Sequence, residues 1–176
     1  MGKILIILLM ISSLSVNAQW RSLGNVDDIQ SVSANQYNIR AGKGVVQLTF
    51  VTTDMVRVRL APDGLFEQDL SWAISKTDFA QTKPIAKDNK EFFVIRGGQI
   101  SVIVYKKPLR LEFYDGAGNL INQDDSLKGM CWNGKEVRVW KTMPLDEEYY
   151  GFGEKTGSLS KRGRTCFFAK AIILFI

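Results

Sequence analysis

The sequence contains no histidine, which narrows the chemistry that its side chains could perform. Without an imidazole group, a Ser-His-Asp triad, a Cys-His pair and a histidine-ligated zinc ion are all excluded. Carboxylates are then the main candidates for general acids and bases, with tyrosine, lysine and cysteine as the others. Acidic residues are adjacent in the segments Asp27-Asp28, Asp124-Asp125 and Asp146-Glu147-Glu148. Because neighbouring carboxylates in polar, turn-rich segments are usually solvated, we interpret these segments as surface loops and not as catalytic pairs.

The most informative segment for function runs from Tyr149 to Gly157, because it combines aromatic, acidic and basic side chains with glycines. It reads Tyr-Tyr-Gly-Phe-Gly-Glu-Lys-Thr-Gly, and a basic stretch, Lys161–Arg164, follows it. As a purely structural pattern, Tyr150 and Phe152 would share one side of a strand, and the glycines would permit a bulge or a close backbone approach. That pattern does not explain why glycine, aromatic ring, glycine, carboxylate and basic loop follow in this order. We therefore select as candidate site residues, without a catalytic, cofactor-binding or metal-binding role, Tyr150, Gly151, Phe152, Gly153, Glu154, Lys155 and Gly157.

Short β-strands are the elements that must position this segment. Val56, Val58 and Leu60 alternate with Arg57 and Arg59, which is the period of a sheet with one face toward a core and the other toward water. We expect the apolar side chains to be buried and the arginines to face water. Residues 25–153 show no sustained helical spacing, so almost no helix is predicted.

Turn residues join these strands into hairpins. Gly97-Gly98 lies between two apolar runs and predicts a tight, two-residue connection, because glycine readily adopts a positive φ. Asp115–Asn119 predicts a second hairpin, and Asn133-Gly134 predicts a third one before Val137–Trp140. Successive hairpins without helices predict an all-β sandwich.

The first residues are typical of a signal peptide. Lys3 precedes an apolar run, Ile4–Ile11, and Val16-Asn17-Ala18 offers small residues at the positions that a signal peptidase reads. We expect residues 1–18 to be removed after Ala18 and the mature protein to be periplasmic or secreted. The apolar run is shorter than the roughly 20 residues of a transmembrane helix, so no stable membrane span is predicted.

The formal net charge of +5 does not indicate nucleic-acid binding. Most lysines and arginines are scattered and alternate with apolar residues, which is typical of a solvated sheet face. Cys131 and Cys166 could form a disulfide in an oxidising compartment, but their spacing alone does not decide whether they do.

Several of these segments together resemble the N-terminal domain of glycoside hydrolase family 31, which comprises α-glucosidases, α-xylosidases and their relatives. Tyr149–Gly157 and the basic stretch after it carry most of the resemblance. Val56–Leu60, Ser71–Ile74 and Leu109–Gly118 are similar to successive strands of that domain. The resemblance extends from about Asn25 to Arg164, which is nearly all of the mature chain.

The resemblance implies a galactose-mutarotase-like β-sandwich over residues 19–165 that packs beside a catalytic (β/α)8 barrel. The loop after the Gly-Phe-Gly-Glu strand would then help to rim the sugar site. The implied partners are an α-glycoside substrate, bound by the full-length enzyme, and the barrel itself; no cofactor is implied. Family members use Asp residues of the barrel, and none of them maps onto this sequence. Because such a barrel takes about 250 residues, we expect this chain to be a fragment that is inactive alone.

Residues 166–176 form an apolar tail that departs from the family pattern, which continues toward a Trp-Asn-x-Asp segment. A frameshift or premature stop is the explanation we prefer. A buried terminal strand and an exposed, aggregation-prone end are the structural alternatives.

A stand-alone carbohydrate-binding module is the alternative function. Aromatic rings can stack on sugars, and the candidates are Trp20, Trp72, Trp132 and Trp140. Tryptophans more commonly pack in a core or an interface, because each buries a large area. A third possibility is a product with no binding or catalytic role that aggregates through the face that would otherwise contact its barrel.

Overall fold

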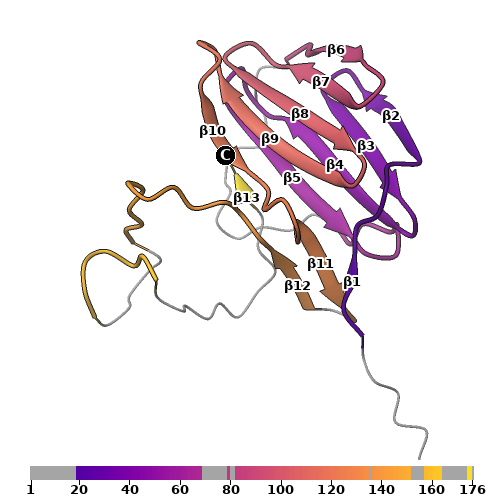
Figure 1. The fold of residues 1–176 in the computed structure, drawn as a ribbon. Helices are drawn as coiled ribbons and strands as arrows, with labels where there is room; N and C mark the ends of the chain where they lie inside the picture. Colours follow the sequence, from indigo (N-terminus) through magenta and orange to yellow (C-terminus); the bar gives the residue numbers. More distant parts are fainter. Residues whose placement is uncertain are drawn as a thin grey trace, which may run out of the picture.

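The computed structural model describes residues 19–68, 79, 82–134, 136–151, 157–163 and 174–175, and this part of the chain contains strands and turns but no helix. Figure 1 shows two larger antiparallel sheets that pack against each other and a small third sheet at one end. The predicted all-β sandwich is confirmed. The predicted signal peptide, residues 1–18, lies outside the described residues.

The three sheets are built almost entirely from strands that are neighbours in the sequence. One five-stranded sheet has the order β13-β5-β4-β3-β2, and its strands are β2 (Asp28–Ser33), β3 (Gln36–Ala41), β4 (Gly44–Phe50), β5 (Val56–Ala61) and β13 (Leu174–Phe175). The other has the order β10-β9-β8-β7-β6, formed by β6 (Ile85–Asp88), β7 (Phe92–Arg96), β8 (Ile100–Lys106), β9 (Leu109–Asp115) and β10 (Leu120–Gln123). The small sheet has the order β1-β11-β12, formed by β1 (Arg21–Ser22), β11 (Met130–Asn133) and β12 (Glu136–Val139).

The hydrophobic core contains residues from both five-stranded sheets. Along β8 and β9, buried and half-buried side chains alternate, as the two-residue period of a strand requires. The largest fully buried side chains are Phe50, Phe113, Ile39, Leu48, Ile95, Leu111, Val46, Val56, Val102 and Val104. Complete burial of such a side chain contributes about 1.5–3 kcal/mol, so apolar burial is the main force that holds the sandwich together.

The hairpin between β7 and β8 also contacts the facing sheet. Gly97 lies so close to Phe50 that a Cβ atom added there would be 2.2 Å from the ring. The N–H groups of Gln99 and Ile100 donate to the Thr53 carbonyl oxygen at 2.8 and 3.2 Å. The predicted hairpin is confirmed, but its connection has a third residue, Gln99, whose N–H makes this contact between the sheets.

The other two predicted hairpins are present as β9–β10 and β11–β12. In the first, Asp115 Oδ1 accepts the N–H groups of Ala117 and Asn119 at 2.9 and 2.8 Å. An aspartate that accepts backbone N–H groups in this way organises a turn. In the second, Gly134 has a φ of 57°, a conformation that glycine adopts without a steric penalty.

On β5 the predicted exposure of the arginines is wrong. Arg57 and Arg59 are half-buried instead of facing water, and Leu60 is half-buried against the core instead of within it. At Arg59 the cause is the segment that follows β5, because Arg59 Nη2 donates to the Glu67 carbonyl oxygen at 2.9 Å. The Arg59 guanidinium lies 5.0 Å from the centre of the Phe66 ring.

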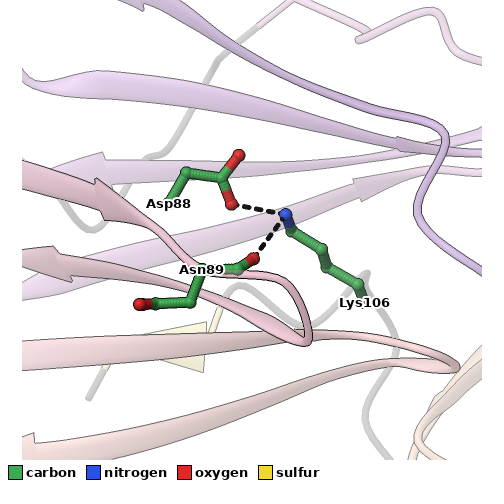
Figure 2. A network of polar contacts seen from close by, with 3 residues as sticks. All are labelled: Asp88, Asn89 and Lys106. Carbon is green, nitrogen blue, oxygen red and sulfur yellow. Dashed lines mark hydrogen bonds and ion pairs between the residues drawn. The ribbon is translucent and has the colours of Figure 1, made fainter.

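A polar network fixes the turn between β6 and β7, as Figure 2 shows. The Lys106 ammonium group, at the end of β8, forms an ion pair with Asp88 and donates to the Asn89 carbonyl oxygen at 2.8 Å. The Lys106 N–H group also donates to the Glu91 carbonyl oxygen at 3.0 Å. These contacts hold the turn against the end of β8.

The structure describes one of the two cysteines and two residues of the apolar tail. Cys131, in β11, is a buried free thiol, and Cys166 lies outside the described residues. Two residues of the tail, Leu174 and Phe175, form β13 and pair antiparallel with β5.

Candidate functional site

The candidate site lies on the segment that follows the end of β12, residues 142–151 and 157–163, which we call the arm. In Figure 1 the arm, in orange to yellow-orange, extends away from the sheets. Leu145 and Leu159 expose 95% and 81% of their surface. Leucine is usually buried in a folded protein, so the arm is not part of the core.

A buried ion pair fixes the base of the arm. The Lys141 ammonium nitrogen lies 2.7 Å from Asp124 Oδ1, and the side chain of Asp124 exposes only 1% of its surface. The second carboxylate oxygen, Oδ2, accepts the N–H group of Leu111 in β9 at 2.8 Å. The N–H group of Thr142 donates to the Gln123 carbonyl oxygen at 3.0 Å. Because both carboxylate oxygens have partners, the arm leaves the sandwich at a defined point.

The burial of Asp124 overturns our interpretation of Asp124-Asp125 as a solvated loop. Its charge is compensated by a lysine from a later segment, which a pattern of adjacent residues does not reveal. Asp125 does organise a turn, since its Oδ1 accepts the N–H groups of Leu127 and Lys128, each at 3.0 Å.

The other predicted acidic pair, Asp27-Asp28, lies on the surface. Both residues are exposed. Asp27 Oδ2 accepts the N–H group of Gly42 at 2.6 Å, and Asp28 begins β2. The surface interpretation is confirmed here.

In the arm, Lys161 and Arg162 bond to the segment that precedes the motif. That segment contains a turn with three acidic residues, Asp146, Glu147 and Glu148, which we call the acidic turn. Arg162 Nη1 donates to the carbonyl oxygens of Pro144, at 2.8 Å, and of Glu147. The N–H group of Lys161 donates to the Tyr149 carbonyl oxygen at 2.7 Å. We call this set of bonds the clamp.

Side chains of the acidic turn complete the clamp. The Ser160 hydroxyl donates to the Glu148 carboxylate, although the two residues are 12 positions apart. Burial raises the pKa of Tyr149, a hydrogen bond to Glu147 raises it further, and the positive charge of Arg162 lowers it. Glu147 and Glu148 therefore have hydrogen-bond partners within the arm. Asp146 and Glu148 are exposed and Glu147 is half-buried, so the interpretation of this acidic segment as a surface loop is confirmed.

Three of the predicted site residues, Tyr150, Gly151 and Gly157, belong to the described part of the arm. Tyr150 exposes 59% of its surface, and it belongs to no strand, in contrast to the strand pattern that its spacing suggested. Gly151 and Gly157 have φ angles of 85° and 107°, which side chains with a Cβ atom rarely adopt. Four further candidates lie outside the described residues, namely Phe152, Gly153, Glu154 and Lys155.

The tryptophans do not form an open aromatic platform in the described part of the chain. Trp132 is buried in β11. The Arg138 guanidinium lies 4.0 Å from the centre of the Trp20 ring. The Lys128 ammonium lies 4.2 Å from the centre of the Trp140 ring. One face of each of these rings is therefore covered by a cation. Trp72 lies outside the described residues.

An open cavity of about 720 Å³ lies beside the β7–β8 hairpin, lined by Thr52, Thr53, Thr82, Lys83, Arg96 and Gly98 among others. Among its described lining residues there is no carboxylate and none of the predicted site residues. Among the described residues, no three His, Cys, Asp or Glu side chains gather closely enough to hold a metal ion. The same residues include no helix that is long and apolar enough to cross a membrane.

Comparison with known protein families decides which fold family this is. The family profile described as "Glycosyl hydrolase 31 N-terminal galactose mutarotase-like domain" matches residues 45–171. The chain belongs to this family. The match includes the whole arm and continues beyond Arg164, where the quoted motifs end. The predicted resemblance and the galactose-mutarotase-like sandwich are confirmed.

Individual relatives agree with this assignment. Alpha-glucosidase 2 of Bacillus thermoamyloliquefaciens is 30% identical over 144 residues, which cover 81% of this chain and 18% of that protein. A GH31 dextranase of Flavobacterium johnsoniae, solved in complex with glucose, has a TM-score of 0.74 and 26% identity over 82% of this chain and 18% of its own. A cycloalternan-forming enzyme of Listeria monocytogenes, solved with a pentasaccharide, shares the fold with a TM-score of 0.66 at 21% identity, over 83% of this chain and 14% of its own.

The structure adds three residues that sequence reasoning did not select, Asp124, Lys141 and Arg162. The sequence shows Arg162 only as one member of the basic stretch Lys161–Arg164 that follows the motif. A signal for Arg162 was available, since an acidic turn and a basic stretch flank the same motif. Nothing in the sequence indicated that Asp124 and Lys141 would meet.

Proposed function

We propose that this chain is the N-terminal β-sandwich of an exported glycosidase that acts on α-linked glycosides. The sandwich supports a catalytic (β/α)8 barrel, and the Tyr150–Gly157 segment contributes to the rim of the carbohydrate site. The chemistry is assigned to the barrel and to no residue of this chain. Export would remove residues 1–18 and release a protein that begins at Gln19.

The observation that carries the proposal is the arm. It carries the exposed residues Tyr150, Gly151 and Gly157 of the predicted motif on a clamped segment of a sandwich that belongs to the GH31 N-terminal family. Its exposed leucines, Leu145 and Leu159, are suited to contact with another apolar surface. The chain spans 18% of the curated α-glucosidase and of the dextranase, so those relatives have ample further chain to supply such a surface.

The alternative of a stand-alone carbohydrate-binding module has less support. A module of that kind needs aromatic faces that a sugar ring can reach. Trp132 is buried, and one face of the Trp20 ring and of the Trp140 ring is covered by a cation.

Calorimetric titration separates the two functions. Residues 19–176 are titrated with maltose and with isomaltotriose, and the complete enzyme serves as the positive control. We expect no saturable heat from the chain alone and saturable binding by the complete enzyme. A saturable signal from the chain alone would favour the binding module and contradict a purely supporting role.

The export proposal has its own test. The protein is expressed with residues 1–18 in a bacterial host that has a periplasm, and the N-terminus of the product is sequenced. We expect the product to be periplasmic and to begin at Gln19. An unprocessed product in the cytoplasm would contradict export.

A further inference from the structure

The two five-stranded sheets differ in the side chains that they turn away from the core. In the β13-β5-β4-β3-β2 sheet, the register places four polar residues in one cross-strand row on the outer side, Gln30, Asn38, Gln47 and Arg59. This is the usual pattern of an antiparallel sheet with one face toward water. In the β10-β9-β8-β7-β6 sheet, the outer side instead carries five large apolar or aromatic side chains, namely Phe92, Val94, Ile103, Tyr105 and Tyr114. We call these five residues the outer face.

The strand register brings the side chains of the outer face together. Ile103 of β8 is paired with Val94 of β7, and Tyr105 is paired with Phe92. The Phe92 and Tyr105 rings meet edge to face, with their centres 6.3 Å apart. All five residues of the outer face are half-buried, and none of them belongs to the hydrophobic core. Contiguous apolar patches on a protein surface commonly mark a contact with another surface.

The tyrosine hydroxyls on the outer face already have a partner. Glu112 Oε2 accepts the hydroxyls of Tyr105 and Tyr114 at 3.1 and 2.7 Å. The Arg110 guanidinium, 5.1 Å from the centre of the Tyr105 ring, places a positive charge on the same side of the sheet as this carboxylate. Covering a polar group costs free energy when the group loses water without gaining a hydrogen bond. Because the two hydroxyls are bonded within the sheet, the outer face suits an apolar partner surface.

The outer face continues to β10, which is the edge strand of the same sheet in Figure 1. Leu120 of β10 is paired with Tyr114 and exposes 45% of its surface. At the other end of β10, the Gln123 carbonyl oxygen accepts the N–H group of Thr142, the first residue of the arm. The apolar surface thus extends from the sheet to its edge strand, beside the base of the arm.

We infer that the outer face is the surface through which the sandwich packs against an apolar surface of the catalytic barrel in the complete enzyme. The inference rests on the proposed function, which supplies that partner. This chain spans 18% of the curated α-glucosidase and of the dextranase, so a large partner within one polypeptide fits these relatives. The barrel is favoured over a second copy of this chain, because the arm, which we propose lies at the carbohydrate site, leaves the sandwich beside the same sheet.

Cysteine labelling measures whether the outer face is covered. Ile103→Cys places a thiol on the outer face, and Gln30→Cys places one on an exposed position of β2, on the outer side of the opposite sheet. Each variant is made in this chain and in the complete enzyme, and alkylation of that position by iodoacetamide is followed by peptide mass spectrometry. We expect Ile103→Cys to react about a hundredfold more slowly in the complete enzyme than in this chain, because the two surfaces must first separate. Gln30→Cys should react at similar rates in both.

A charge placed on the outer face gives a second readout. Val94 is paired with Ile103, so Val94→Lys would put an ammonium group into the apolar contact, where a charge without a partner is costly. In the complete enzyme we expect Val94→Lys to restore labelling of Ile103→Cys to within about tenfold of its rate in this chain. Gln30→Lys, the control with the same added charge, should leave the slow labelling unchanged. Equal rates with Val94→Lys and with Gln30→Lys would contradict an apolar contact at this face.

The labelling rates also separate this inference from the proposed function. Fast labelling of Ile103→Cys in a complete enzyme that still cleaves an α-glycoside would overturn the inference and leave the proposed function intact. Slow labelling in this chain alone would also overturn it, because a second copy would cover the face if the rate depended on protein concentration, and the chain itself would cover it if the rate did not. Slow labelling in a complete protein without glycosidase activity would support the face as an interface and contradict the proposed function.

Discussion

In the sandwich, Leu48 of β4 is completely buried, whereas in the arm Leu145, a side chain of the same type, exposes 95% of its surface. The contrast extends to the forces in each region. The sandwich is held by apolar side chains in the core, and the arm is held by hydrogen bonds among exposed or half-buried groups. Apolar burial makes a region stable by itself, while exposed apolar groups on a polar clamp suit a region that contacts another surface.

The largest expected effect separates these two leucines directly. Leu48→Ala removes fully buried methyl groups and leaves a cavity, so we expect a loss of about 2–5 kcal/mol in the free energy of unfolding. Leu145→Ala is the matched variant in the arm and should change it by less than about 0.5 kcal/mol. Urea unfolding followed by tryptophan fluorescence measures both. Equal losses would mean that the arm belongs to the cooperative core.

The ion pair at the base of the arm should have the next largest effect on the free energy of unfolding. Asp124→Asn leaves the Lys141 ammonium without its buried partner, and we expect a loss of about 2–4 kcal/mol. The matched control is Glu136→Gln, whose ion pair with Arg138 is exposed on both sides and should contribute less than about 1 kcal/mol.

A double variant sharpens this test. Asp124→Asn combined with Lys141→Met removes both charges, so it should be more stable than Asp124→Asn alone. If the single and double variants have the same stability in urea unfolding, the ion pair does not join the arm to the sandwich.

The smallest expected effect is a change in stability that is seen only at alkaline pH. It arises from the hydrogen bond between Tyr114 and Glu112. The Tyr114 hydroxyl donates to Glu112 at 2.7 Å, and this hydrogen bond, with burial, raises the pKa of Tyr114 to about 12. A folded-state pKa above the unfolded value of about 10 means that the folded protein holds this proton more tightly. Its contribution to stability is therefore complete below about pH 10 and is lost as the pH rises through about 12.

We expect Tyr114→Phe to remove part of this alkaline loss of stability. Unfolding of wild type and variant between about pH 9 and 12 measures the difference. Tyr105 also donates to Glu112, at 3.1 Å, so Tyr105→Phe should remove a further part. Identical pH profiles for all three proteins would contradict the assigned role of the Glu112 hydrogen bonds.

The fold was largely predictable because its determinants are local. Alternation in the β5 and β8 segments and turn residues such as Asn133-Gly134 specify strands and hairpins over a few positions each. The half-burial of Arg59 was not predictable in this way, because it depends on a segment that covers the sheet after the strand has ended.

The candidate site was predictable only as a motif. The order of residues from Tyr149 to Gly157 led to the correct family, which the match over residues 45–171 confirms. Its support could not be predicted, because the Asp124–Lys141 pair and the Arg162 clamp join residues that come together only in the folded chain. A strand through Tyr150 was expected from spacing alone, but Gly151 beside it has a φ of 85°, in the left-handed region.

We infer that the sandwich is stable by itself while the arm is held by local contacts. Native-state hydrogen exchange of residues 19–176 at increasing urea concentration tests it most directly. We expect amides of the central strands β4 and β8 to exchange only through global unfolding, with a free energy that falls steeply with urea, and the Lys161 amide to exchange through local opening that barely depends on urea. If Lys161 showed the same free energy and the same dependence on urea as β4 and β8, the arm would be part of the core and the claim would be wrong.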